Sequence, residues 1–276
     1  MVEEEPVDPL RPFLKWPGGK RWAAFKIAAL VKTYLSGKYY EPFLGGAAVF
    51  FHLRPEQAIL GDINADLVNV YRLVRDRPDE VQSALRQLSV SKRRYDSFRS
   101  SKPRSHLDRA VRFLYLNRTC FGGIYRLNKS GLFNVPYGGG QRTPRILWKT
   151  DLLANASTAL GDAELLTEDF GIALKRAGKG DVVYCDPAYT VAHDNNAFVR
   201  YNESNFSWED QIRLAKLAQS AVARGAVVIV SNAHHKSVRL LYPTASRRVL
   251  HRTSLINPDA KNRRAVSEYL FVLTPD

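Results

Sequence analysis

The sequence predicts an α/β protein in which a parallel sheet is interrupted by a mostly helical, basic insertion. Strand-like and helix-like segments alternate from about residue 13 to 67 and again from about 166 to the end, which is typical of parallel sheets with crossover helices. Residues 68–165 show mainly helical periodicity and a run of Lys and Arg. We therefore expect a core domain of residues 13–67 and 166–276, an inserted subdomain of 68–165, and a flexible tail of 1–12.

The two alternating blocks contain the predicted strands and their crossover helices. In the first block, FLKWPGGKR (13–21) and an apolar helical stretch (23–35) precede a strand that ends at YYEPF (39–43). A glycine turn, a helix around AAVFFHL (47–53) and a strand AILGDIN (58–64) follow. The second block contains the strand DVVYCDP (181–187), a helix over 208–225, the strand AVVIVSN (226–232) and a terminal strand SEYLFVL (267–273). β-Branched and aromatic runs that end at Gly, Asp or Pro are typical of strands.

The insertion is basic as well as helical. Helical periodicity runs through residues 70–88 and through AVRFLYLN (110–117), and a glycine-rich loop follows. Between the two helical stretches lies SKRRYDSFRSSKPRSHLDR (91–109). Such a run suits contacts to phosphates, which give affinity without sequence information. For any single Lys or Arg in it, a solvated surface position is the commoner explanation.

The charge balance points to a polyanionic partner. The chain has 276 residues, of which 45% are hydrophobic and 25% charged, as in ordinary soluble globular proteins. However, 41 Lys and Arg against 27 Asp and Glu leave a net charge of +14, with an isoelectric point near 9.8. Nucleic acid is the commonest partner for so basic a protein.

Metal sites, membrane spans and targeting segments are not expected. The two cysteines, Cys120 and Cys185, form no CxxC pattern, and the adjacent His234 and His235 lack the helical spacing that would point both rings at one ion. No apolar segment approaches the ~20 residues needed to cross a bilayer. The acidic, proline-rich N-terminus is unlike a signal or transit peptide, so the cytoplasm is the expected location.

Two predicted strand ends have residues that suit a nucleoside. Glu41 begins a Glu-Pro-Phe-Leu-Gly-Gly turn where a strand gives way to a helix, which is where doubly wound sheets bind nucleotides. Gly45 and Gly46 allow a tight turn, but the GxGxxG spacing of a pyrophosphate site is absent. Asp62 ends the next strand, where an acid commonly binds ribose hydroxyls. Taken singly, each piece is explained equally well as a turn with a capping acid.

Two further motifs are ambiguous when they stand alone. In FLKWPGGK, the Gly-Gly turn before a helix favours an anion, and Lys20 can complete a carboxylate site. The alternative is an ordinary helix entry with Trp16 packed in the core. VVYCDPAYT (182–190) reads as a strand followed by a turn, because Asp-Pro starts turns readily.

Taken in order, these motifs resemble one enzyme family. FLKWPGGK, EPFLGG, GDIN, LNRTCFGGIYRLNKSGLFNVPYG and VVYCDPAY resemble the Dam-type DNA adenine-N6 methyltransferases, over nearly the whole chain after the tail. The resemblance implies a Rossmann-like, S-adenosylmethionine-dependent methyltransferase sheet with an inserted DNA-recognition subdomain. It further implies double-stranded DNA as the partner of a monomeric enzyme with no obligate protein partner.

The same resemblance implies where S-adenosylmethionine binds. Contacts are expected from Trp16, Lys20, Glu41, Phe43, Gly45, Asp62, Asp169, Phe170 and Asp186. The turn at residues 41–46 would lie under the methionine moiety of the cofactor. Asp169 and Phe170, in LLTEDF, would lie near its adenine.

The implied catalytic residues are Asp186, Pro187 and Tyr189. The exocyclic amine of adenine is a poor nucleophile because its lone pair is delocalised, so a site must accept hydrogen bonds from N6–H. The Asp186 carboxylate and the Pro187 carbonyl are the two expected acceptors, and Tyr189 is expected to stack on a base extruded from the duplex. Such catalysis works by positioning and electrostatics, without a covalent intermediate. The family pattern is Asp-Pro-Pro-Tyr, and Ala188 here removes the stiffening that a second proline imposes on Pro187.

The glycine-rich loop supplies the implied reading residues. Arg126 matches a family arginine that reads a guanine, which an arginine fork does through O6 and N7. Phe121 matches an aromatic at the DNA stack, whereas Gly122 stands where family members carry another residue. The expected DNA contacts are Arg118, Phe121, Ile124, Arg126, Asn128, Pro136 and, in a basic loop before the last strand, Lys261, Arg263 and Arg264.

Three functions stay open at the level of sequence. The first is adenine-N6 methylation of DNA, with GATC as the candidate target because Arg126 and its neighbours resemble the Dam pattern. The second is cytosine-N4 methylation, whose sites more often carry Ser-Pro-Pro-Tyr, so that Asp186 favours adenine. The third is a DNA-binding relative in which Ala188 marks lost catalysis.

Overall fold

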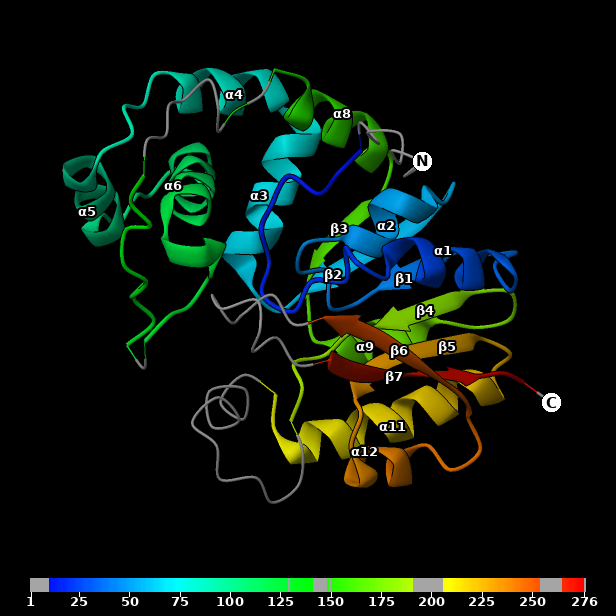
Figure 1. Ribbon diagram of the computed structural model, residues 1–276. Helices are drawn as coiled ribbons and strands as arrows, with labels where there is room; N and C mark the ends of the chain where they lie inside the picture. Colours follow the sequence, from blue (N-terminus) through cyan, green and yellow to red (C-terminus); the bar gives the residue numbers. More distant parts are fainter. Residues whose placement is uncertain are drawn as a thin grey trace, which may run out of the picture. The chain divides into compact units, whose positions relative to one another are not determined.

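The computed structural model describes residues 10–128, 130–140, 148, 150–190, 206–253 and 265–275. Within it the chain forms two compact units (Figure 1). Unit 1 comprises Met1–Lys20, Gly45–Arg54 and Asn64–Thr167, and unit 2 comprises Arg21–Leu44, Pro55–Ile63 and Glu168–Asp276. Neither unit is a single stretch of sequence, because the chain passes between them several times.

Unit 2 contains a mixed sheet. Its strands are β1 (Tyr39–Glu41), β2 (Ala58–Asp62), β4 (Val182–Cys185), β5 (Val227–Ala233), β6 (Ser246–Thr253) and β7 (Ala265–Leu273). They follow the order β2-β1-β4-β5-β7-β6, in which the first four are parallel and β7 is antiparallel to both neighbours. Every residue of β4 is buried, as expected for a central strand covered on both faces.

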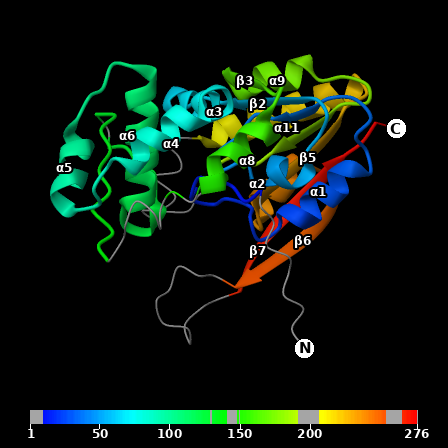
Figure 2. The ribbon, with the colours of Figure 1, turned by 90° about the horizontal axis from the view of Figure 1, so that it is seen from above.

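The helices of unit 2 are α1 (Ala24–Lys32), α9 (Phe170–Arg176), α11 (Trp208–Ala223) and α12 (Lys236–Leu241). Figures 1 and 2 show α1 on one side of the strands and α11 on the other. α11 begins at a capping box, in which the Ser207 side chain accepts from the Asp210 N–H and the Asp210 carboxylate accepts from the Ser207 N–H. This cap sets where α11 starts and hence which of its residues face the sheet.

Unit 1 is mostly helical. Its elements are α2 (Ala48–Leu53), α3 (Ala65–Asp76), α4 (Pro78–Arg86), α5 (Lys92–Ser100), α6 (His106–Thr119), the 3₁₀ turn η1 (Phe121–Gly123), α8 (Thr150–Leu160) and the strand β3 (Glu164–Thr167). α3 packs against α6, α8 and β3, and α5 lies beside α6 in both views (Figures 1 and 2). The Arg72 guanidinium on α3 donates to the Leu165 carbonyl through Nε and Nη2, at 3.1 and 2.6 Å.

The predicted α/β class and the predicted strands are confirmed, and two strands were missed. β6 has the sequence SRRVLHRT, and its Arg and His residues are more typical of a loop than of a strand. They are tolerated here because β6 is an edge strand, which pairs on one side only. β3 has four residues, too few to show a period. The helix around residues 48–53 lies in unit 1, although the sequence analysis placed it in the core domain. The catalytic and recognition roles of these segments stay predictions.

Candidate functional site

Three acidic residues occupy neighbouring strand ends in unit 2. Glu41 is the last residue of β1, Asp62 is the last residue of β2, and Asp186 directly follows β4. β2 lies on the far side of β1 and β5 on the far side of β4, so the strand order reverses between β1 and β4. In open α/β sheets, ligands bind outside the carboxyl ends of the strands at this reversal. Glu41 and Asp186 therefore stand at the expected ligand crevice.

The Glu41 carboxylate is buried and held by a neighbour on its own strand. Glu41 is 3% exposed, and the hydroxyl of Tyr39 donates to its Oε2 at 2.8 Å. Burial, and then the Glu41 charge, raise the pKa of Tyr39 well above its usual range, so the phenol keeps its proton and remains a donor. The sequence therefore supplies both an acid at this strand end and the group that orients it.

The turn after β4 is anchored through Tyr189. Its hydroxyl donates to Oε2 of Glu268 at 2.7 Å. Burial, followed by the charges of Asp186 and Glu268, raises the pKa of Tyr189, which keeps this hydroxyl a donor. Because the hydroxyl is bonded, the orientation of the half-buried ring is restrained.

Cys185 directly precedes Asp186 and is unsuited to act as a nucleophile. Its thiol is fully buried, and burial, with the nearby charges of Asp186 and Glu41, raises its pKa. The thiolate is the reactive form of cysteine. The raised pKa therefore keeps Cys185 in the unreactive thiol form.

Glu268 was missed by the sequence analysis. It lies on β7 opposite Ala233 of β5, so it reaches the same edge of the sheet as Asp186, and it is only 2% exposed. The signal in the sequence is an acid within a mostly apolar terminal strand. A buried Glu is rare unless it is paired, so an acid in such a strand predicts a carboxylate with a bonding partner.

Asp169 and Phe170 are engaged by their own chain. Asp169 caps α9 by accepting from the Gly171 N–H at 2.9 Å, and both its carboxylate oxygens receive the Arg213 guanidinium, at 2.7 and 2.8 Å. Arg213 lowers the pKa of Asp169. The Phe170 ring stacks on Phe43 at 5.2 Å, and Arg213 lies 4.0 Å from its centroid. These bonds account for both residues structurally, and their contact with a nucleobase stays a prediction.

In unit 1, Trp16 explains why a glycine is needed at position 45. Gly45 has a φ of +46°, and a Cβ there would lie 2.8 Å from Cδ1 of the Trp16 indole. The indole also stacks on Tyr125, with 5.6 Å between ring centroids. Lys20, at the end of the same segment, is 3% exposed and donates from Nζ to the Gly18 carbonyl at 3.1 Å. The tight turn predicted at Gly45 thus brings its backbone close to the Trp16 indole.

The glycine-rich loop, residues 120–137, exposes some of its apolar residues, whereas Phe133 and Val135 are buried. Phe121 is 61% exposed and Ile124 39%. Arg126 is also exposed, and its Nε donates to Oδ1 of Asn134 at 2.9 Å. No other hydrogen bond of the Arg126 side chain is found within the described part of the chain. The two terminal guanidinium nitrogens are therefore available for an outside acceptor.

Other predicted contact residues in unit 1 support the shape of this loop. Asn128 Oδ1 accepts from the N–H groups of Ser130 and Leu132, at 3.0 and 2.9 Å, which closes the turn. The Pro136 carbonyl accepts from the Phe121 N–H at 2.9 Å. Arg118 lies partly buried in the last turn of α6. The structure thus gives Asn128 a local role that the sequence analysis did not anticipate.

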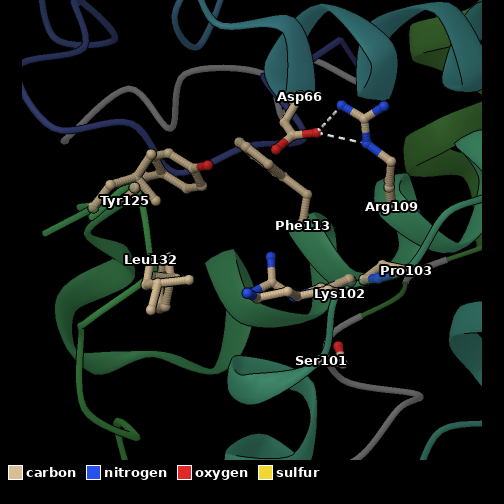
Figure 3. Close-up of a pocket in the computed structure, with 12 residues that line it drawn as sticks. Asp66, Ser101, Lys102, Pro103, Arg109, Phe113, Tyr125 and Leu132 are labelled. Atoms are coloured by element: carbon tan, nitrogen blue, oxygen red, sulfur yellow. Dashed lines mark hydrogen bonds and ion pairs between the residues drawn. The ribbon is translucent and has the colours of Figure 1, made fainter. Parts of the chain in front are cut away.

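A pocket of about 260 Å³ opens beside the same loop (Figure 3). Its cations include Lys102, Arg109 and Arg112, and aromatic and aliphatic side chains line the rest. Arg109 is neutralised by Asp66, with Nε and Nη2 at 2.9 and 2.5 Å from Oδ1. Arg112 donates to two backbone carbonyls, and burial lowers its pKa. The pocket therefore combines net positive charge with apolar walls.

Some predictions cannot be placed. Lys261, Arg263 and Arg264 lie outside the described residues. Among the residues that are described, no group of His, Cys, Asp and Glu is arranged to hold a metal ion. In the same part of the chain, no helix has the length and apolarity to cross a membrane.

Comparison with known proteins places these features in a family context. Residues 16–261 match the model of the D12 class N6 adenine-specific DNA methyltransferases. The chain is 34% identical to the Type II methyltransferase M1.LlaDCHI of Lactococcus lactis subsp. cremoris, covering 95% of this chain and 94% of that protein. It is 37% identical to the Type II methyltransferase M.MjaIII of Methanocaldococcus jannaschii, covering 82% and 85%. It is 33% identical to the DNA adenine methylase of Escherichia coli (strain K12), covering 96% of each.

Proposed function

Because the chain belongs to the D12 class N6 adenine-specific DNA methyltransferase family, we propose that it transfers a methyl group from S-adenosylmethionine to N6 of an adenine extruded from double-stranded DNA. The observation that carries the proposal is the row of acidic residues at the ends of β2, β1 and β4, with Asp186-Pro187 beside the reversal of strand order.

The acids of unit 2 fit the chemistry of this cofactor. S-adenosylmethionine supplies an electrophilic methyl group on a positively charged sulfur, and it also carries an ammonium group and ribose hydroxyls. Asp62 is partly exposed at its strand end and would accept from ribose hydroxyls, and Glu41 would face positive charge. Phe43 is the least buried ring of its aromatic cluster and would meet the adenine. The contacts expected of Trp16, Lys20 and Gly45 stay predictions from the resemblance.

Asp186, Pro187 and Tyr189 would act on the target base. The Asp186 carboxylate and the Pro187 carbonyl accept hydrogen bonds from N6–H, which returns electron density to the nitrogen. Tyr189 stacks on the extruded base. Its hydrogen bond to Glu268 holds the ring in one orientation before the base arrives. The burial of Pro187 supports a site from which water is excluded.

Unit 1 supplies the proposed recognition of DNA. Its loop exposes Phe121, Ile124 and Arg126, and Lys102 and Arg112 add positive charge in the neighbouring pocket. Phosphates would provide the affinity and Arg126 the discrimination. We propose a target that contains guanine, with GATC as the first sequence to test, and a monomer as the active form.

Sequencing of methylated bases tests this proposal directly. The chain is expressed in a host that has no DNA methyltransferase of its own, and the genomic DNA is then read for modified bases. We expect N6-methyladenine within one short sequence motif. N4-methylcytosine would overturn the choice of base, and unmodified DNA would identify the chain as a DNA-binding relative without catalysis.

Ala188→Pro is expected to stabilise the protein and to speed methyl transfer modestly. The Ala188 N–H donates no hydrogen bond in the described residues, so a proline ring removes no donor that is in use. If the φ of residue 188 suits proline, the gain should be roughly 0.4–1 kcal/mol of unfolding free energy. A following proline also restricts Pro187 to extended ψ values, which should raise the methylation rate. The increase should stay below about tenfold, because a tenfold gain would require ~1.4 kcal/mol from one torsion. Thermal melts and single-turnover methylation of a short duplex measure both effects.

The opposite result would also be informative. A variant that melts earlier and methylates more slowly would show that the native conformation at Ala188 is incompatible with proline. The geometry of the turn would then differ from that of the Asp-Pro-Pro-Tyr pattern.

A further inference from the structure

Two fully buried amides lie behind the turn that follows β4. Gln211 on α11 and Asn232 on β5 are both 0% exposed. Gln211 Nε2 donates to the carbonyl of Ala188 at 3.3 Å, and its Oε1 accepts from Nδ2 of Asn232 at 2.8 Å. Asn232 Oδ1 in turn accepts from the N–H of Ala233 at 2.8 Å. A chain of hydrogen bonds therefore runs from the backbone of β5 to the backbone of the turn.

The polarity of this chain sets the orientation of each amide. The Ala188 carbonyl can only accept, so Gln211 has to present its nitrogen there and its oxygen to Asn232. Buried Gln and Asn are uncommon, and their polar atoms are costly to bury unless bonded. An apolar residue of similar volume could fill the same space without that requirement. The paired amides therefore indicate that this site requires hydrogen bonds of a fixed direction, toward the Ala188 carbonyl, and not only a side chain that fills the space.

We propose that Gln211, oriented by Asn232, is a positioning residue that aims the Pro187 carbonyl. This inference rests on the proposed role of that carbonyl as an acceptor for adenine N6–H. The ring of Pro187 fixes its φ, and Gln211 holds the carbonyl one residue later. The peptide between these two anchors carries the Pro187 carbonyl, so its freedom to rotate is small.

The next residues of the turn are anchored by different partners. Tyr189 is bonded to Glu268 on β7, and the Thr190 hydroxyl donates to the Phe206 carbonyl at 2.6 Å. Without Gln211, these bonds would still hold the end of the turn. Loss of Gln211 is therefore expected to loosen the Pro187 peptide without releasing the whole segment.

Gln211→Met tests the positioning role in the full chain. Methionine has nearly the same length but cannot donate to the Ala188 carbonyl. We expect the single-turnover methylation rate to fall roughly 10- to 100-fold, as small misplacements of reacting groups do. The affinities for DNA and for S-adenosylmethionine should change by less than about threefold, because the change affects the chemical step. If Gln211→Met fails to fold, Gln211→Leu removes the same donor to the Ala188 carbonyl with a smaller apolar side chain.

Gln82→Met is the matched control. Gln82 is also buried, at 8% exposure, and its Nε2 donates to a backbone carbonyl, that of Trp148, at 3.2 Å. It lies on α4 in unit 1. This variant should melt at a lower temperature, as any lost buried hydrogen bond implies, but retain the wild-type methylation rate.

Two further readouts separate positioning from general damage. Combining Gln211→Met with Ala188→Pro should recover part of the lost methylation rate. A proline at position 188 restricts the ψ of Pro187, and so restrains the same peptide without the Gln211 bond. Amide hydrogen exchange in the peptide that spans residues 186–190 should be faster in Gln211→Met and unchanged in Gln82→Met. The exchange measurement needs no activity, so it tests the restraint even if the wild-type chain transfers no methyl group and the proposed function fails.

Wild-type exchange and a wild-type rate in a folded Gln211→Met protein would overturn the inference. So would a rate loss that Ala188→Pro does not relieve and that comes with an equal loss of cofactor affinity, since Gln211 would then be supporting the cofactor site.

Discussion

Asp186→Ala is expected to reduce methyl transfer by roughly 10²–10³-fold or more, while leaving the protein folded. The change removes one of the two proposed acceptors for adenine N6–H, and single members of such electrostatic sites contribute on this scale, ~2.7–4 kcal/mol. Asp186 is the first residue beyond the buried strand β4, so its position is set by four residues that cannot move without disrupting the sheet. Its own side chain contributes little to the apolar core.

The matched control for this variant is Asp181→Ala, immediately before the same strand. Asp181 Oδ1 accepts from the Lys38 N–H at 2.8 Å, and Oδ2 accepts from the Gly178 N–H at 3.0 Å. Its loss should lower the melting temperature but leave the single-turnover rate unchanged. Asp186→Asn keeps one side-chain oxygen and removes the negative charge. It therefore separates the effect of accepting a hydrogen bond from the effect of the charge. Appreciable turnover by purified Asp186→Ala would remove Asp186 from the catalytic assignment.

The parts of the fold that were predictable are those with a local signal. VVYC in β4 and VVIV at the start of β5 are continuous apolar runs, and each became a strand at the predicted place because buried parallel strands require such runs. Turn residues then located the strand ends, and with them Glu41, Asp62 and Asp186. Local patterns thus place the acids at strand ends, and strand order then places them side by side.

The supporting residues could not be predicted because their partners are distant in sequence. Glu268 and Tyr189 are 79 residues apart, and Gln211 and Asn232 are 21 apart on different elements. A pattern analysis assigns Gln and Glu to solvated faces, which is correct for most of them. Asp169 shows both cases. Its capping bond to Gly171 is local and can be predicted from the sequence, whereas its ion pair with the distant Arg213 cannot.

Arg126→Ala is expected to relax discrimination at one guanine by roughly 1–3 kcal/mol, which is about 5- to 150-fold in relative rate or affinity. Its Nε is taken by Asn134, so the guanidinium is held by one edge and presents its two terminal nitrogens. Such preorganisation suits paired hydrogen bonds to O6 and N7 of guanine. Asn134→Ala should cause a smaller loss in the same direction, because it frees the guanidinium without removing it.

The measurement compares binding to the methylated motif and to duplexes with one substituted guanine, over a range of salt concentrations. Arg126→Ala should leave non-specific affinity and its salt dependence nearly unchanged. Arg93→Ala, at an exposed position of α5, is the control for a phosphate contact. It should weaken binding to all sequences equally and reduce the salt slope by about 0.9. If Arg126→Ala behaves like Arg93→Ala, then Arg126 binds phosphate, and the base-reading residue lies elsewhere in the chain.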